Sequence, residues 1–295
     1  GNLFGGVQTQ EGPVGLRGGG GHLFELDWHS KILWEYKDHY HHHDQRRCPN
    51  GNTLYASSEL LPEKLANRVQ GGRPGSELAV GIYGDVLREI SPDGTLVWEW
   101  KASECEEMYS YPLNPMCDRV EFSHANSIVP LENGDVLVNF RYNHLMAVID
   151  RQSKEFKWTL CDWSFGQQHN VHMLDNGNIL FFANGSNVLY GGPSAGSKAV
   201  ELNPTTKKII WEYQGTPTAS FFSWFISGAQ RLSSGNTLIC EGAWGRLFEV
   251  TSEGDIVWEF INPYFSTNHP NYKGYNFVFR AYRYGLNSPE IAGRI

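Results

Sequence analysis

The chain has 295 residues, of which 40% are hydrophobic and 19% charged, the composition of an ordinary globular protein. Its net charge of -8 opposes binding to the phosphates of nucleic acids or of an anionic membrane surface. This charge predicts no nucleic-acid partner. The chain contains no apolar run of about 18 residues, so we also expect no membrane span.

The N-terminus and the five cysteines leave the cellular compartment open. No signal peptide is visible, and because the chain begins at Gly1 rather than Met, the removal of a leader peptide stays an open alternative. The cysteines form no Cys-x-x-Cys pair. Cys105 and Cys117 either close a small loop as a disulfide or are free buried thiols, and both readings are retained.

One strand pattern with a central Trp occurs five times along the chain. A short apolar strand and a tight turn precede each copy, as in "LFELDWHSK" and "LREISPDGT". Alternating apolar residues around a tight turn predict a β-hairpin. The five Trp strands are "ILWEYK" at 32–37, "LVWEWK" at 96–101, "FKWTLC" at 156–161, "IIWEYQ" at 209–214 and "IVWEFI" at 256–261.

A second hairpin signature follows four of the Trp strands, with Asn-Gly or Ser-Gly at its turn. Its copies are "RRCPNGNTLY", "VPLENGDVLV", "HMLDNGNILF" and "QRLSSGNTLI". Together the two hairpins make a unit of four antiparallel strands, which is typical of a propeller blade. We therefore predict an all-β fold, a single β-propeller domain over residues 1–295 with five blades. Six blades are the alternative if "LFGGVQ" and residues 102–120 contain further strands, whereas a β-sandwich would not repeat in register.

The two ends of the chain are predicted to share one blade. The chain opens with strands "HLFELD" and "ILWEYK" and ends with the apolar stretch "NFVFRAYRY" at 276–284. Such N- and C-terminal strands would close the ring and protect its edges. The recurring tryptophans are predicted to pack between blades; they are Trp34, Trp98, Trp158, Trp211 and Trp258.

Histidines recur at matching positions when the blades are aligned on the Asn-Gly or Ser-Gly turn. The residues seven positions before the turn are His43, Asn126, His169 and Ser227. Those nine positions before it are His41, His124, Gln167 and Phe225. Positions two apart share a face of a strand, so the two rows predict a polar ring at the start of the inner strands.

The second strand of each blade runs back to the same rim and would bring Arg141 near His124 and Asn184 near His169. We expect His43, His124, His169 and Arg141 to meet at one mouth of the channel as catalytic residues. Histidine serves proton transfer, nucleophilic attack or metal ligation, and Arg binds an anion. The predicted substrate contacts are His41, Asn126, Gln167, Asn184 and Trp224, the last from the aromatic stretch "ASFFSWF" at 219–225. Residues 184–186 also match a glycosylation sequon, a weak pattern.

The remaining histidines receive no catalytic role. His172 lies three residues after His169 and is predicted to be structural. His39, His42 and His144 stay unassigned, and His22, His29 and His269 are expected on loops or the surface.

The segments "HHHDQRRCPNGNTL", "FSHANSIVPLENGDVLVNFR" and "QQHNVHMLDNGNIL", each followed by a Trp-Glu or related strand, resemble the arylsulfotransferase family of β-propellers over residues 20–285. The resemblance implies transfer of a sulfuryl group between phenols, with no cofactor. By motif, His169 matches the nucleophile, His124 and Arg141 match the pair that stabilises the sulfuryl group, and His43 matches the first histidine of the set.

The chain departs from the best-known bacterial members of that family, which carry an N-terminal β-sandwich domain and six blades. It resembles a shorter, divergent branch, and the resemblance favours a periplasmic or secreted location. In each reading the partner is a small aromatic or anionic molecule. One alternative is a metal-dependent lyase or hydrolase in which His43, His124 and His169 bind a divalent ion. The other is a non-catalytic, ligand-binding propeller.

Overall fold

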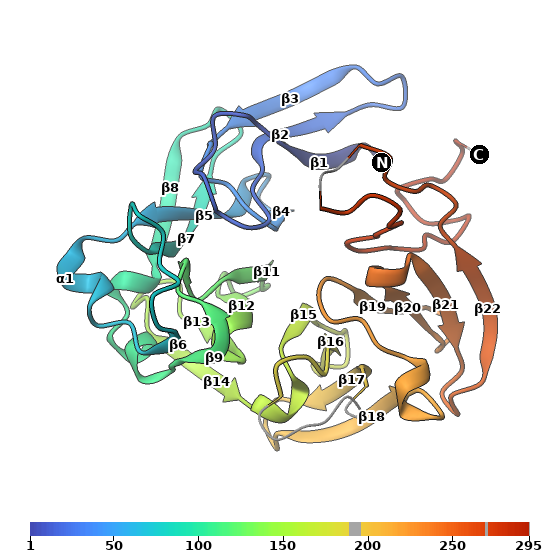
Figure 1. The fold of residues 1–295 in the computed structure, drawn as a ribbon. Coiled ribbons are helices and arrows are strands. Elements are labelled where there is room, and N and C mark those ends of the chain that lie inside the picture. The colour runs from blue at the N-terminus through green and yellow to red at the C-terminus, as the bar shows by residue number, and fades with distance from the viewer. Residues whose placement is uncertain (189–195, 269–270, 295) are drawn as a thin grey trace. The chain divides into compact units, whose positions relative to one another are not determined.

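The repeated hairpins form five antiparallel sheets that follow one another along the chain (Figure 1). This computed structural model describes residues 1–188, 196–268 and 271–294, so His269 lies outside the described residues. The predicted all-β class is confirmed, and the arrangement is that of a five-bladed β-propeller. The chain divides into unit 1, residues 1–161 with 284–295, and unit 2, residues 162–283. The single domain over residues 1–295 stays a prediction.

Unit 1 holds three blade sheets and a separate two-stranded sheet. The first has the order β1-β2-β3 and the third the order β11-β12-β13-β14. In the second, β4, β5, β7 and β8 form the antiparallel blade, and β10 adds to β7 in parallel. The strands are β1 (Leu3–Gln8), β2 (Gly21–Leu26), β3 (Ile32–Lys37), β4 (Gln45–Arg47), β5 (Thr53–Leu60), β7 (Tyr83–Ile90), β8 (Leu96–Lys101), β10 (Glu121–Phe122), β11 (Ala125–Pro130), β12 (Val136–Phe140), β13 (Leu145–Ile149) and β14 (Phe156–Cys161).

Unit 2 holds two four-stranded sheets, with the orders β15-β16-β17-β18 and β19-β20-β21-β22. In both, each strand pairs with the next along the chain, as the hairpin pattern predicts. The strands are β15 (Gln168–Met173), β16 (Ile179–Ala183), β17 (Lys198–Asn203), β18 (Lys208–Gln214), β19 (Gly228–Arg231), β20 (Thr237–Glu241), β21 (Arg246–Val250) and β22 (Ile256–Ile261).

Burial falls from the second to the fourth strand of a blade. Every residue of β12, β16 and β20 is buried, whereas all of β22 is exposed and β14 is mostly partly exposed. The second strands have neighbours on both faces and therefore read as continuous apolar runs. The fourth strands are outer strands, and apolar residues such as Ile256 and Val257 of β22 remain accessible.

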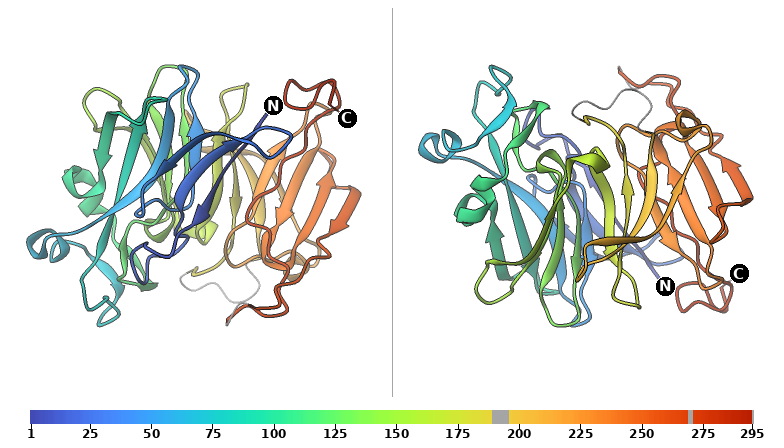
Figure 2. Two further views of the ribbon diagram at one scale, coloured as in Figure 1. Left: turned by 90° about the horizontal axis from the view of Figure 1, so that it is seen from above. Right: turned by 90° about the horizontal axis from the view of Figure 1, so that it is seen from below.

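The segment between β5 and β7 is an insertion that lies at the outer side of unit 1 (Figure 2). It contains the short helix α1 (Glu63–Ala66) and strand β6 (Gly71–Arg73). Strand β6 pairs in parallel with β9 (Leu113–Asp118), which comes from the insertion after β8. No helix in the described ranges is long and apolar enough to cross a membrane.

The chain ends differ from the expected shared blade. The stretch 276–284 forms no strand. The first sheet consists of β1, β2 and β3, so β1 is the strand added to the predicted hairpin β2-β3. The segment nevertheless lies along unit 2, because Arg283 N donates to Gln230 Oε1 at 2.7 Å and Gln230 Nε2 donates to Arg283 O at 3.0 Å. Side chains and single backbone groups anchor it where the sequence predicted a ladder.

Three tryptophans of the row, Trp34, Trp98 and Trp211, bond to the neighbouring blade, as predicted. The indole Nε1 of Trp34 donates to Pro92 O, that of Trp98 to Arg151 O and that of Trp211 to Ser252 O, each at 2.9 Å. Each acceptor lies in or next to the third-to-fourth-strand turn of the following blade. One indole thus both covers apolar surface and satisfies a turn carbonyl.

An Arg–Glu pair accompanies these tryptophans. Arg151 binds Glu89 and lies over Trp98, while Arg231 binds Glu201 and lies over Trp211. The same set recurs at Arg47 with Glu25 and Trp34, and at Arg283 with Glu249 and Trp258. Arg283, from the C-terminal stretch, completes the set for the last blade of unit 2.

All five cysteines are free thiols. Cys105 and Cys117 are both buried and are not joined to each other, so the disulfide alternative is not formed.

Candidate active site

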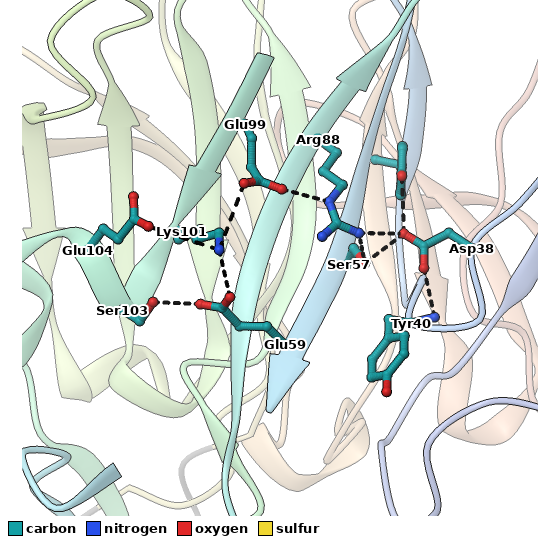
Figure 3. Close-up of polar contacts among 10 residues, drawn as sticks. Asp38, Tyr40, Ser57, Glu59, Arg88, Glu99, Lys101, Ser103 and Glu104 are labelled. Atoms are coloured by element: carbon teal, nitrogen blue, oxygen red, sulfur yellow. Dashed lines mark hydrogen bonds and ion pairs between the residues drawn. The ribbon is translucent and has the colours of Figure 1, made fainter. Parts of the chain in front are cut away.

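The loop that carries His41, His42 and His43 is fixed by Asp38 at the end of β3 (Figure 3). The Asp38 carboxylate accepts from Tyr40 N at 2.9 Å, Ser57 Oγ at 2.9 Å and Arg88 Nη1 at 2.8 Å. Arg88 in turn binds Glu99 at 2.9 Å, so the loop is tied to the second sheet through two strands. These contacts hold the pKa of Asp38 below its usual value although its burial opposes this.

His41 is buried beneath the loop 18–21. Its Nδ1 accepts from Gly21 N at 3.3 Å and its Nε2 lies 3.1 Å from Gln45 Oε1. Burial, with the nearby His42, lowers the pKa of His41 to about 4. A substrate-contact role for His41 stays a prediction, but both ring nitrogens already bond within the chain and support the loop.

His42 and His43 are linked through their rings. His42 Nδ1 lies 3.0 Å from His43 Nδ1, and His42 Nε2 lies 2.9 Å from Ser57 O and 3.1 Å from Asp85 Oδ1. The His43 ring in turn lies edge-on to His124, with the centroids 4.4 Å apart. The sequence left His42 unassigned, yet it connects a predicted catalytic histidine to a buried carboxylate.

A second buried carboxylate holds His124. The Nδ1 atom of His124 lies 2.6 Å from Glu121 Oε2, and Glu121 Oε1 accepts a hydrogen bond from Arg17 N at 3.0 Å. Strand β10 pairs in parallel with β7 and sets Glu121 opposite Tyr83, two residues from Asp85. Burial raises the pKa of Glu121 and, with the positive charge of Arg141, holds the pKa of His124 well below its usual value. The His124 imidazole is therefore neutral at pH 7.

Arg141 lies beside His124, the neighbour that the blade alignment predicted. Its backbone N donates to His124 O at 3.1 Å. Among the described residues its guanidinium has no carboxylate partner, and its buried Nε has no hydrogen-bond partner. The adjacent Tyr142 stacks on the His124 ring at 4.4 Å and 10°, and its buried hydroxyl is also unpartnered within the described chain. Burial lowers the pKa of Arg141 from its ordinary high value. An unpaired, partly buried guanidinium is a binding group for an anion.

The alternation by which positions two apart share a strand face does not hold at His43 and His124. His43 and His124 have φ of 54° and 60°, and Ser123 has 106°, all in the left-handed region. They lie before β4 and β11 begin, and a register shift follows between Ala125 and Ser127. Non-glycine residues with positive φ are strained and gather at functional sites, so the turn itself directs these side chains.

In unit 2, Asn184 fixes the ring of His169. Its Oδ1 lies 2.6 Å from His169 Nδ1, and its Nδ2 donates to Ser223 O at 2.8 Å and Ile226 O at 3.0 Å. Two carbonyl acceptors identify the amide nitrogen, so the oxygen faces His169 and must accept a proton from Nδ1. In the neutral ring the lone pair then lies on Nε2. Asn184 is fully buried in these contacts and is no accessible glycosylation site.

The other predicted substrate contacts have different surroundings. Gln167 is buried with φ of 70°, and its Oε1 lies 3.4 Å from Ser186 Oγ. Asn126 is buried in β11 and accepts from Asn139 Nδ2 at 2.7 Å. Trp224 is partly exposed and packs on Trp244 at 5.1 Å. Their roles towards a substrate stay predictions.

Within the described ranges, no group of three or more His, Cys, Asp or Glu is arranged to hold a metal ion. His43 and His124 belong to unit 1 and His169 to unit 2, and their convergence stays a prediction.

Sequence reasoning missed three residues of the unit 1 cluster, namely His42, Asp85 and Glu121. Glu121 stands three residues before His124, and His42 lies within the run "HYHHHD", so local spacing offered a signal for both. Asp85 offered none, because only strand pairing brings it to the cluster.

The repeated antiparallel blades and the buried histidines at their inner turns define a β-propeller protein. The arylsulfotransferase (ASST) family matches residues 14–263, and the chain belongs to this family. A comparison with curated proteins found no match.

Solved structures support the fold alone. A protein of unknown function from Bacteroides caccae is 16% identical with a TM-score of 0.52, covering 82% of this chain and 76% of that one. A streptogramin B lyase is 13% identical with a TM-score of 0.47, covering 89% and 72%. An inactive virginiamycin B lyase variant from Staphylococcus aureus, solved with quinupristin, is 12% identical with a TM-score of 0.46, covering 90% and 75%. The latter two similarities are too low to carry an argument.

Proposed function

We propose that this arylsulfotransferase-family protein moves a sulfuryl group from an aryl sulfate to a second phenol through a covalent adduct on His169. The observation that carries the proposal is the contact between His169 Nδ1 and Asn184 Oδ1 at 2.6 Å. The amide holds the ring with its lone pair on Nε2, and a neutral imidazole is a good nucleophile near pH 7.

In the first step the His169 Nε2–S bond forms as the aryl O–S bond breaks, and the phenolate leaves with a proton from a histidine. In the second step the oxygen of another phenol attacks the sulfur, the N–S bond breaks, and the phenol gives up its proton. The sulfuryl group carries negative charge on three oxygens. Arg141 supports the proposal because its guanidinium has no carboxylate partner among the described residues.

His124 supports the binding part of the proposal, because it lies beside Arg141 and its buried ring is held by Glu121. Each of these residues has a role that can be tested by itself.

The test compares His169→Gln with His172→Gln, a matched change in the same strand β15. We expect wild-type protein incubated with p-nitrophenyl sulfate to gain the mass of one SO₃ group on the peptide that contains His169. Loss of the nucleophile should reduce turnover by at least about 1,000-fold. His172 bonds Asn170 O at 2.9 Å, and its variant should keep adduct and turnover.

Turnover should follow ping-pong kinetics and persist after exhaustive chelation of divalent metals. Wild-type protein that forms no adduct and transfers no sulfuryl group with any aryl sulfate would contradict the proposal.

A further inference from the structure

The fully buried His42 has one ring nitrogen whose protonation the structure fixes. Its Nε2 lies 2.9 Å from Ser57 O and 3.1 Å from Asp85 Oδ1. A backbone carbonyl can only accept a hydrogen bond, so Nε2 carries a proton whatever the charge of the ring.

The other ring nitrogen of His42 faces His43. Their Nδ1 atoms are 3.0 Å apart, so one of them must donate. When the proton is on His43 Nδ1, the neutral His43 ring has its lone pair on Nε2. When the proton is on His42 Nδ1, His43 has an N–H at Nε2 and His42 is a cation.

Asp85 is placed to stabilise that cation. Its Oδ2 accepts from Ser123 Oγ at 2.6 Å and from Ala125 N at 2.8 Å, while Oδ1 faces His42. The carboxylate is therefore held in position before any proton moves. Burial alone would lower the pKa of His42, but Asp85, together with Glu121 and Ser57 O, raises it. A carboxylate behind an imidazole orients the ring and supports its charged form.

We propose that His42, backed by Asp85, is a positioning residue that shares one proton with His43 and sets whether His43 offers a lone pair or an N–H at Nε2. The inference rests on the proposed function for its role in the reaction. When His43 Nε2 gives its proton to the leaving phenolate, the shared proton moves from His42 Nδ1 to His43 Nδ1. When Nε2 takes the proton of the acceptor phenol, the shared proton returns to His42. The cycle therefore closes without a net gain or loss of protons.

The first test is the dependence on the leaving group. His42→Asn keeps an amide within the loop but cannot become a cation. Turnover of phenyl sulfate, whose phenolate needs a proton, should fall about 100-fold, while p-nitrophenyl sulfate, a donor with a weakly basic leaving group, should lose less than about 3-fold in the adduct-forming step. The KM for the donor should not change.

The matched control is His144→Asn in the same unit. His144 is also fully buried, and its Nε2 lies 2.9 Å from Asn114 Nδ2. The His144→Asn variant should lower the turnover of the two donors by the same factor or not at all. Equal losses with both donors in His42→Asn would show that His42 is merely structural, and the proposal would be wrong.

The second test does not depend on turnover. NMR of protein labelled with ¹⁵N-histidine should show a proton bonded between two Nδ1 atoms in the wild type and its loss in His42→Asn. An unprotonated Nε2 on His42, or His43 ring signals unchanged in the variant, would overturn the inference. If the shared proton is present but no aryl sulfate is turned over, the proposed function fails while the proton-sharing pair stands.

Discussion

Individual side chains in this protein take their properties from the group that holds them. His169 is held by an amide, His124 by a carboxylate, and His43 by a second imidazole with a carboxylate behind it. An amide cannot titrate, so it fixes one tautomer, whereas a carboxylate also stabilises a cation. The three histidines are therefore chemically different although the same repeat position supplied two of them.

Asn184→Leu tests whether the amide sets the state of His169. The change removes the acceptor for Nδ1–H and leaves the carbonyls of Ser223 and Ile226 unpaired. We expect it to lower the free energy of unfolding by about 1–3 kcal/mol. Formation of the His169 adduct should slow by about 100-fold, measured by rapid-quench mass spectrometry at a temperature where the variant stays folded.

Asn114→Leu provides the comparison for this prediction, because Asn114 is a buried amide that bonds another histidine, His144. It should lose similar stability but keep the adduct rate. Equal rates for the two variants would show that Asn184 contributes to stability alone.

At the scale of strands, the blades are connected by a repeated set of Trp, Glu and Arg. Glu89 shows how it works, since its carboxylate binds Arg151 and accepts from Asn52 Nδ2 at 2.6 Å. Burial would raise the pKa of Glu89, but these partners lower it. The group therefore stabilises the fold at a pH above the ordinary Glu value of about 4.3, and this contribution is lost as the pH falls through the lower, folded-state pKa.

Glu89→Gln should destabilise the protein at pH 7 by about 1–3 kcal/mol, because Arg151 loses its charged partner. The difference from wild type should shrink as the pH is lowered below about 4, where the wild-type carboxylate also becomes protonated. Urea unfolding across this pH range measures both effects.

The exposed Glu132, substituted in the same way, is the control and should change stability little. A Glu89→Gln deficit that stays constant down to the acid limit would contradict the ionic origin of the effect.

At the scale of the molecule, each unit has its own buried core, and the five cysteines, all within the described ranges, form no disulfide. The core of unit 1 includes Trp100 and Phe140, and that of unit 2 includes Phe182 and Phe248. Stability therefore comes from packing and from the contacts between blades.

Thiol titration tests this description. Without reductant, the denatured protein should show five reactive thiols, and dithiothreitol should not change the Tm. In the native state the exposed Cys161 should react first. Burial raises the pKa of Cys48 to about 11 and that of Cys240 to about 12, which keeps both as unreactive thiols. Fewer than five thiols in the denatured chain would contradict the free state of Cys105 and Cys117.

The sequence by itself determined the repeat, and through it the fold. A hairpin is a local structure, so the Trp strands and the Asn-Gly turns could be placed from spacing alone, as could the pairing of Arg141 with His124. The expected strand at 276–284 failed because an apolar run does not say whether its backbone has a partner. The run instead supplies isolated contacts, such as the Arg283 side chain on Glu249 and the Val278 backbone on Gly242.

Only the tertiary structure decided the surroundings of the histidines. Asp85 reaches His42 through the pairing of β5 with β7, and left-handed turns at His43 and His124 override the alternation of a strand. Hydrogen-bond partners depend on side chains far apart in the sequence, and a local pattern contains no information about them. Motif alignment could therefore identify His169 and Arg141 as candidates, but the tautomer of one and the unpaired charge of the other follow from the packed fold.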